Sequence, residues 1–169
     1  MSSIAQRQHP VNTNAVRTRE RTAAGDAFSG LVPRVFRLNG LLAAEGDALA
    51  RPAGQTTARW QLLAMVENEP ATVAQTARTL GLARQSVQRV ADVLEAEGLV
   101  AFLDNPSHRR ARLVTLTPPG KAALATIQAA QRPWADAIGR AVGEAQLAQA
   151  GRVLDRVIAV LTERRTSED

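Results

Sequence analysis

The side chains best suited to specific recognition lie in one short run, ARQSVQRVADVLEAEG, from residue 83 to residue 98. Its apolar residues recur at helical spacing, which leaves a set of polar side chains on the opposite face: Arg84, Gln85, Ser86, Gln88 and Arg89. Guanidinium and carboxamide groups can form paired hydrogen bonds with guanine and adenine edges in the major groove of DNA. The run therefore predicts a recognition helix. The alternative is the ordinary solvated face of an amphipathic helix.

A second short helix is predicted directly before this run. Thr72 is suited to cap its N-terminus, and Val73, Ala77 and Leu80 lie at the spacing of one helical face. Gly81 ends the helix and allows a tight turn into the next one. Two helices joined in this way predict a helix-turn-helix.

The run LVAFLDNPSHRRARLVTLT follows the helix pair, from residue 99 to residue 117. Apolar residues alternate at both of its ends, which predicts two short strands. Residues 104–107 between them have turn chemistry, and the tip is basic, with His108, Arg109 and Arg110. A helix pair followed by such a hairpin predicts a winged helix-turn-helix.

These runs, together with TPPGKAAL after the second strand, resemble the signature of the MarR family (multiple antibiotic resistance regulators) from Thr56 to about Leu124. The resemblance implies a dimeric DNA-binding repressor, released by a small ligand that is often an aromatic acid. It also implies site roles on matching positions. The recognition helix would read DNA through Arg84, Gln85, Ser86, Gln88 and Arg89. The wing arginines Arg109 and Arg110 are the further DNA-binding candidates, and one of them would enter the minor groove. Asp104 would be a wing-stabilising carboxylate that pairs with an arginine across the hairpin.

Two details of this resemblance depend on local geometry. Neighbouring residues of a strand point to opposite faces, so Arg109 and Arg110 should not reach DNA in the same way. We assign Arg109 to the DNA and Arg110 to an ion pair with Asp104, and a shift of the hairpin by one residue would exchange them. Ala83 replaces the capping residue that is common before the recognition helix, which leaves the first amides of that helix without a side-chain partner.

The whole sequence divides into four predicted segments. These are a flexible basic arm over residues 1–25, an N-terminal dimerisation helix over 26–55, the DNA-binding domain over 56–117, and C-terminal dimerisation helices over 118–169. Pro33 is expected to start or kink its helix and Pro133 to kink its own. Thr56 is expected to cap one further helix, and Thr117 with Pro118 to start another, while Gly46 and Gly143 should loosen or break helices. Trp60 is expected in the core that supports the helix pair, and a place in an effector pocket is the alternative. Leu147, Leu154 and Leu161 recur every seven residues, a spacing that favours a helical partner. We therefore expect a mostly α-helical homodimer with a small β-wing, and packing within one chain is the alternative.

Composition agrees with a polyanionic partner. The formal net charge is +5, carried by arginine and one lysine. Cysteine is absent, and the only histidines are His9 and His108, so we expect no disulfide, thiol chemistry, metal site or cofactor. No arrangement suggests an enzyme, and neither a membrane span nor a secretory signal is expected, which favours the cytoplasm. The remaining alternative is a winged-helix protein-interaction or architectural module without an effector. No residue is assigned to effector binding.

Overall fold

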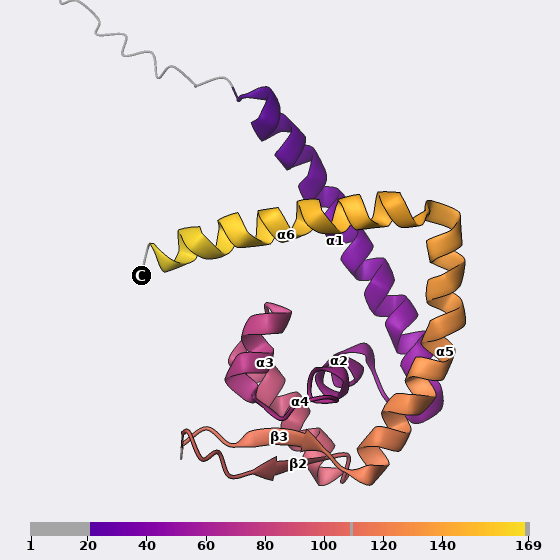
Figure 1. The fold of residues 1–169 in the computed structure, drawn as a ribbon, viewed down its shortest axis with the longest axis vertical. Helices are drawn as coiled ribbons and strands as arrows, with labels where there is room; N and C mark the ends of the chain where they lie inside the picture. Colours follow the sequence, from indigo (N-terminus) through magenta and orange to yellow (C-terminus); the bar gives the residue numbers. More distant parts are fainter. Residues whose placement is uncertain (1–20, 109, 168–169) are drawn as a thin grey trace, which may run out of the picture. The chain divides into compact units, whose positions relative to one another are not determined.

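The computed structural model describes residues 21–108 and 110–167. The described residues divide into two units, one up to Gly40 and one from Leu41 onward, and the boundary falls within the first helix. The described elements are α1 Ala23–Ala50, η1 Arg51–Ala53, α2 Thr57–Met65, β1 Ala71–Thr72, α3 Val73–Leu80, α4 Arg84–Ala96, β2 Val100–Leu103, β3 Leu113–Leu116, α5 Pro118–Val142 and α6 Glu144–Thr166 (Figure 1). The predicted fold class, mostly helical with a small β-wing, is confirmed. None of these helices combines the length and hydropathy that a membrane span requires.

The first unit contains the N-terminal part of α1. The helix begins at Ala23 and runs through Pro33, so the expectation that it would start at this proline was wrong, while a kink there stays a prediction. Proline costs about 3 kcal/mol within a helix because it removes one hydrogen bond. A helix of 28 residues retains its bonds on both sides of that position. Several large apolar side chains of this part are exposed: Phe28, Val35, Phe36 and Leu38.

The end of α1, in the second unit, is fixed to the start of α2. Both the backbone N–H and the hydroxyl of Thr57 donate to Oδ1 of Asp47, at 2.7 and 2.8 Å, and these bonds hold the pKa of Asp47 below its usual value. Gly46 lies against the same threonine, where an added Cβ would come within 2.6 Å of the Thr57 hydroxyl. Thr56 caps α2 as predicted. The glycine that the sequence suggested as a helix breaker is therefore a packing residue inside the helix.

The helix-turn-helix has the predicted local signals. Thr72 and Gln75 form a reciprocal capping box at the start of α3, and Gly81 ends this helix with φ of 66°. Ala83 provides no side-chain cap for α4. The side chains of Val87, Ala91 and Leu94 turn one face of α4 into the core, so its polar residues face outward.

The wing is a hairpin of β2 and β3, paired antiparallel from Val100↔Leu116 to Leu103↔Leu113. The sequence predicted these two strands but not β1, a strand of two residues that pairs with the other edge of β3. The sheet order is thus β1-β3-β2. Because β1 directly precedes α3, this pairing ties the helix pair to the wing.

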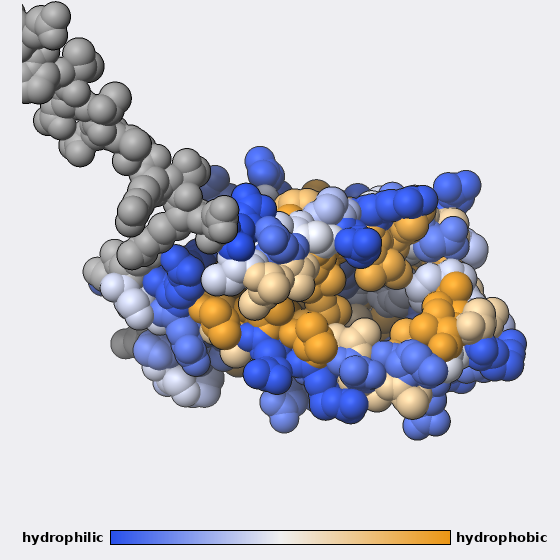
Figure 2. All heavy atoms as spheres, turned by 90° about the horizontal axis from the view of Figure 1, so that it is seen from above, coloured by the Kyte–Doolittle hydropathy of each residue, from blue (hydrophilic) through white to orange (hydrophobic). Residues whose placement is uncertain are grey.

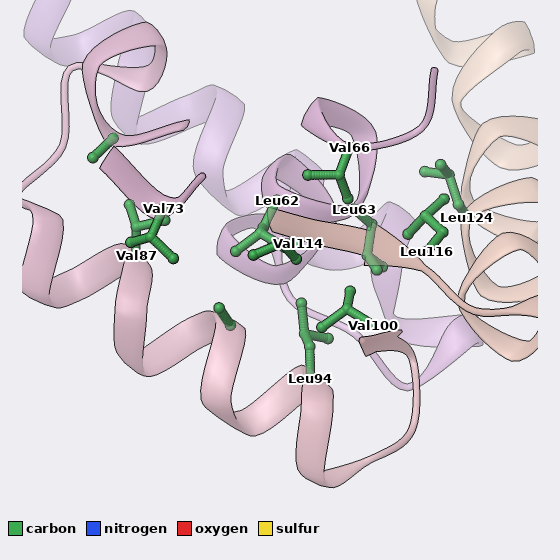
Figure 3. Close-up of a cluster of buried hydrophobic side chains, with 12 residues drawn as sticks. Leu62, Leu63, Val66, Val73, Val87, Leu94, Val100, Val114, Leu116 and Leu124 are labelled. Atoms are coloured by element: carbon green, nitrogen blue, oxygen red, sulfur yellow. The ribbon is translucent and has the colours of Figure 1, made fainter. Parts of the chain in front are cut away.

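One apolar core joins the helices and the sheet of the second unit. Figure 3 shows side chains from α2, α3, α4, the strands and α5 converging on it. Leu63, Ala91 and Leu94 are fully inaccessible to solvent, and Trp60 packs against the cluster from its edge. The predicted core role of Trp60 is therefore confirmed. This core packs α4 against the strands at the base of the wing.

The C-terminal helices begin where the wing ends. Thr117 caps α5, and Pro118 occupies its first position, as predicted. The predicted break at Gly143 is confirmed, and Pro133 lies inside α5, where the expected kink stays a prediction. Figure 1 shows α5 leading from the end of β3 to α6. No described residue of α6 is buried, and several of its large apolar side chains are exposed, among them Leu147, Ile158 and Leu161.

Candidate nucleic-acid interface

The predicted reading residues lie along the outer side of α4. Arg84, Gln85 and Arg89 are exposed, whereas Ser86 and Gln88 are half-buried. All five are in the first two turns of the helix, the part that enters the major groove in helix-turn-helix proteins. The structure therefore brings the five predicted side chains together at one end of one helix.

The polar side chains of α4 fall into two rows. Arg84, Gln88 and Asp92 succeed each other every four residues and form the row beside the wing. Gln85 and Arg89 form the adjacent row, in which both residues are exposed. This division separates the residues that can contact another molecule freely from those that face the wing.

Gln88 is held within the first row. Its Nε2 donates to Oδ1 of Asp92 at 2.7 Å, which leaves the carbonyl oxygen and one N–H of the amide for another partner. Arg89 approaches the hydroxyl of Ser86 at 3.5 Å, a long contact that does not hold the guanidinium. Among the predicted base-contacting residues, Gln88 is thus held by a short hydrogen bond and Arg89 only by a long one.

A hollow of about 200 Å³ separates α4 from the wing. It is lined by the first row of α4, by the start of α3 at Thr72, Val73 and Ala74, and by wing residues Phe102, Arg110, Ala111 and Arg112. Three arginines, from α4 and the wing, face two carboxylates of α4, Asp92 and Glu95. The hollow has a net positive charge and lies between the two elements predicted to contact DNA.

The wing residues are placed only in part. Arg110 is exposed and lines the hollow. Arg109, the residue assigned to DNA, lies outside the described residues. Asp104 follows the end of β2, but the described residues include no ion pair between Asp104 and Arg110. The role of Asp104 as a wing-stabilising residue stays a prediction, and so does the DNA contact of Arg109.

Sequence reasoning missed two residues here, Arg112 and Asp92. Nη2 of Arg112 donates to the carbonyl oxygen of Phe102 at 2.8 Å, and Cζ lies 4.9 Å from the centre of the Phe102 ring. The hairpin register explains the omission. Because Leu103 pairs with Leu113, the position opposite Asp104 is Arg112 rather than Arg110. Asp92 stands four residues after Gln88, a helical spacing from which its hydrogen bond could have been anticipated.

Within residues 21–108 and 110–167, no three His, Asp or Glu side chains are grouped to hold a metal ion. The segment of residues 72–120 carries six arginines and four acidic residues, a net charge of +2. The most distinctive arrangement is therefore the cationic and amide-bearing surface of α4 and the wing.

Similarity to known proteins agrees with this geometry. Residues 53–111 match the model of the MarR family. The uncharacterized protein Rv2011c of Mycobacterium tuberculosis is 40% identical over 140 residues, which cover 83% of this chain and 98% of that protein. The uncharacterized protein Mb2034c of Mycobacterium bovis has the same identity and coverage.

Solved structures share the fold over most of the chain. The transcriptional regulator PA3341 gives a TM-score of 0.68 at 28% identity and covers 80% of this chain and 98% of its own. BldR from Sulfolobus solfataricus gives 0.70 at 19% identity, with coverages of 79% and 96%. The M. tuberculosis regulator MOSR, solved in complex with DNA, gives 0.65 at 22% identity, with coverages of 77% and 96%.

The capped helix pair, the three-stranded sheet and the polar face of α4 define a winged helix-turn-helix protein of the DNA-binding class. The sequence matches and the structural matches point to the same family. The chain belongs to the MarR family, and the structural relatives described above are transcription regulators.

Proposed function

We propose that this protein is a sequence-specific transcriptional repressor that binds a pseudo-palindromic DNA site as a homodimer. The observation that carries the proposal is the placement of base-reading side chains, Gln85 and Arg89 above all, on the exposed row of α4 beside a basic wing. Arginine pairs with guanine and glutamine with adenine in the major groove. A protein-interaction module would have no need of this set.

Selection from a randomised duplex library tests the readout. A sequence-specific dimer should enrich two related half-sites about one helical turn apart, because the symmetry of the protein imposes symmetry on the site. The double variant Gln85→Ala/Arg89→Ala should lose this enrichment, whereas Arg140→Ala, an exposed change on α5, should retain it. Tight binding without enrichment would favour the alternative, an architectural winged-helix module.

The dimer is supported by the apolar surface of α6. Leu147, Leu154 and Leu161 are exposed at 42, 36 and 48%, and Ile158 at 61%. Figure 2 shows hydrophobic side chains, in orange, on the face over which α6 runs. An apolar stripe with heptad spacing is stabilised by another helix, and a second copy of the chain supplies one. Light scattering should give twice the mass of the chain, and a monomer at micromolar concentration would contradict this part of the proposal.

Release from DNA is proposed to occur through a non-covalent small molecule. The MarR resemblance supports this mode, and the absence of cysteine removes thiol oxidation as a trigger. A panel of aromatic carboxylic acids provides the first probes: an effector should weaken DNA binding, and DNA should weaken effector binding by the same factor. Peroxide should have no effect on specific binding. A loss after mild peroxide treatment with Met65 unoxidised would contradict the non-covalent mode.

Repression itself needs a test in cells. A reporter driven by the selected DNA site should be less active when the protein is present and should recover when an effector is added. Lower activity in the absence of the protein would instead identify an activator.

A further inference from the structure

Arg112 is held more firmly than an ordinary surface arginine. Its guanidinium donates to the Phe102 carbonyl at 2.8 Å and lies over the Phe102 ring, with Cζ 4.9 Å from the ring centre. The hydrogen bond fixes one edge of the guanidinium, and the cation–π contact fixes its plane. The side chain therefore has one preferred direction, although it is exposed to solvent.

The anchor of this arginine is itself tied to the core. Phe102 pairs with Val114 across the hairpin and packs, half-buried, against the core cluster. Arg112 is two residues before Val114, so it occupies the diagonal position relative to Phe102 on the same face of the sheet. The contact thus connects the outer end of the wing to the buried part of the sheet.

Arg112 also faces α4. Together with Phe102 it lines the hollow whose other wall carries Asp92 and Glu95. Guanidinium has five N–H donors, and the bond to Phe102 uses one of them. The other N–H groups of Arg112 lie between the wing and α4, the helix with the predicted base-contacting residues.

We propose that Arg112 is a positioning residue that fixes the direction of the wing relative to α4. In this role it would not contact DNA itself but would allow the wing arginines and α4 to reach their grooves at the same time. The inference rests on the proposed DNA-binding function. A positioning role differs from a phosphate contact in its chemical requirements. A phosphate contact needs only a positive charge, whereas the positioning role needs the planar guanidinium of Arg112 and the ring of Phe102 beneath it.

The test compares Arg112→Lys, Arg112→Ala, Phe102→Leu and the double variant Phe102→Leu/Arg112→Lys in the full chain. Lysine retains the charge but loses the planar fork, and leucine retains much of the core contact but loses the ring. Arg140→Lys on α5 is the matched control because it makes the same chemical change on an exposed helix. Two quantities are measured: affinity for the selected duplex across salt concentrations, and amide hydrogen exchange of residues 100–116 without DNA.

For Arg112→Lys we expect roughly tenfold weaker binding to the selected duplex, the size of a lost charged hydrogen bond plus a cation–π contact. The salt dependence should stay unchanged, and exchange in the wing should be faster. Phe102→Leu removes the ring but keeps the backbone carbonyl, so it should cause a smaller loss in the same direction. The double variant should lose less than the sum of the two single variants, because both changes remove the same cation–π contact. Arg140→Lys should behave as the unmodified protein.

Other results would overturn the proposal. Full affinity in Arg112→Lys, with a shallower salt dependence in Arg112→Ala, would identify a direct phosphate contact. Additive losses in the double variant would show that Arg112 and Phe102 act separately. If the unmodified protein bound no DNA, the proposed function would fail, but hydrogen exchange would still decide the role of Arg112: unchanged exchange in Arg112→Lys would refute it.

Discussion

Replacing Gly120 by alanine would force apart the start of α5 and the turn that follows α4. An added Cβ at this position would lie 1.9 Å from the carbonyl oxygen of Leu99 and 2.9 Å from its carbon. Both atoms are backbone, so no side-chain rotation can relieve the clash. The helix would have to move away from the turn.

The size of the effect follows from the contacts at this junction. Thr117 donates from its N–H to the Leu99 carbonyl at 3.1 Å and from its hydroxyl to the Gly98 carbonyl at 2.6 Å. Losing both hydrogen bonds costs about 2 kcal/mol, and overpacking adds about 1–3 kcal/mol. Alanine recovers up to about 1 kcal/mol through its helix propensity. We therefore expect Gly120→Ala to lower the free energy of unfolding by about 2–4 kcal/mol.

Urea unfolding followed by circular dichroism measures this change, at a fixed protein concentration because dimerisation contributes to stability. Gly139→Ala is the control in the same helix. A Cβ at Gly139 meets no atom within 4 Å, so alanine should stabilise the protein by up to about 1 kcal/mol. If Gly120→Ala were as stable as the unmodified protein, or matched Gly139→Ala, the argument from the Leu99 contact would be refuted.

Four further predictions concern recognition, assembly and pH. Arg89→Ala should cost about 1–3 kcal/mol on the selected DNA and little on random DNA in fluorescence titrations, and so should Gln88→Ala; equal losses on both DNAs would identify phosphate contacts. If Arg109 contacts a phosphate, Arg109→Ala in both subunits should flatten the slope of log affinity against log salt by about two; an unchanged slope and affinity would remove Arg109 from the interface. Leu154→Glu should shift light scattering from dimer toward monomer, and an intact dimer would place the interface away from this part of α6. The depressed pKa of Asp47 means that its charge stabilises the fold above the unfolded pKa, about 4, and that this contribution is lost as pH falls through the folded pKa. The difference in melting temperature between the unmodified protein and Asp47→Asn should therefore shrink on acidification below about pH 4, and a constant difference would contradict the role of this carboxylate.

Local signals in the sequence were sufficient for most of the helix boundaries. Thr72 and Thr117 cap helices because a hydroxyl can accept from the free amides of the first turn, and this preference depends on few distant contacts. Gly81 and Gly143 end or separate helices at positive φ, a conformation that glycine adopts without strain. The recognition helix followed from the same kind of argument, because helical spacing alone separates its polar face from its apolar face.

The predictions that failed concern positions where the surrounding structure outweighed the preference of the single residue. Pro33 was expected at the start of the regular helix, but α1 begins before it, at Ala23. Gly46 looked like a helix breaker and is instead the residue that lets Thr57 pack against α1. The strand β1 was missed because two residues carry no periodic pattern, and only the pairing with β3 defines them.

By itself, the sequence determined the winged helix-turn-helix, its family and the five candidate DNA-contacting residues of α4. Each of these conclusions depends only on residue types at short spacing in the chain. The tertiary structure decided which of these side chains face the wing and which face outward, since that depends on how the core orients α4. It also decided the hairpin register, which places Arg112 over Phe102. Strand alternation has a period of two residues and leaves register open, so only the pairing of Leu103 with Leu113 could settle it.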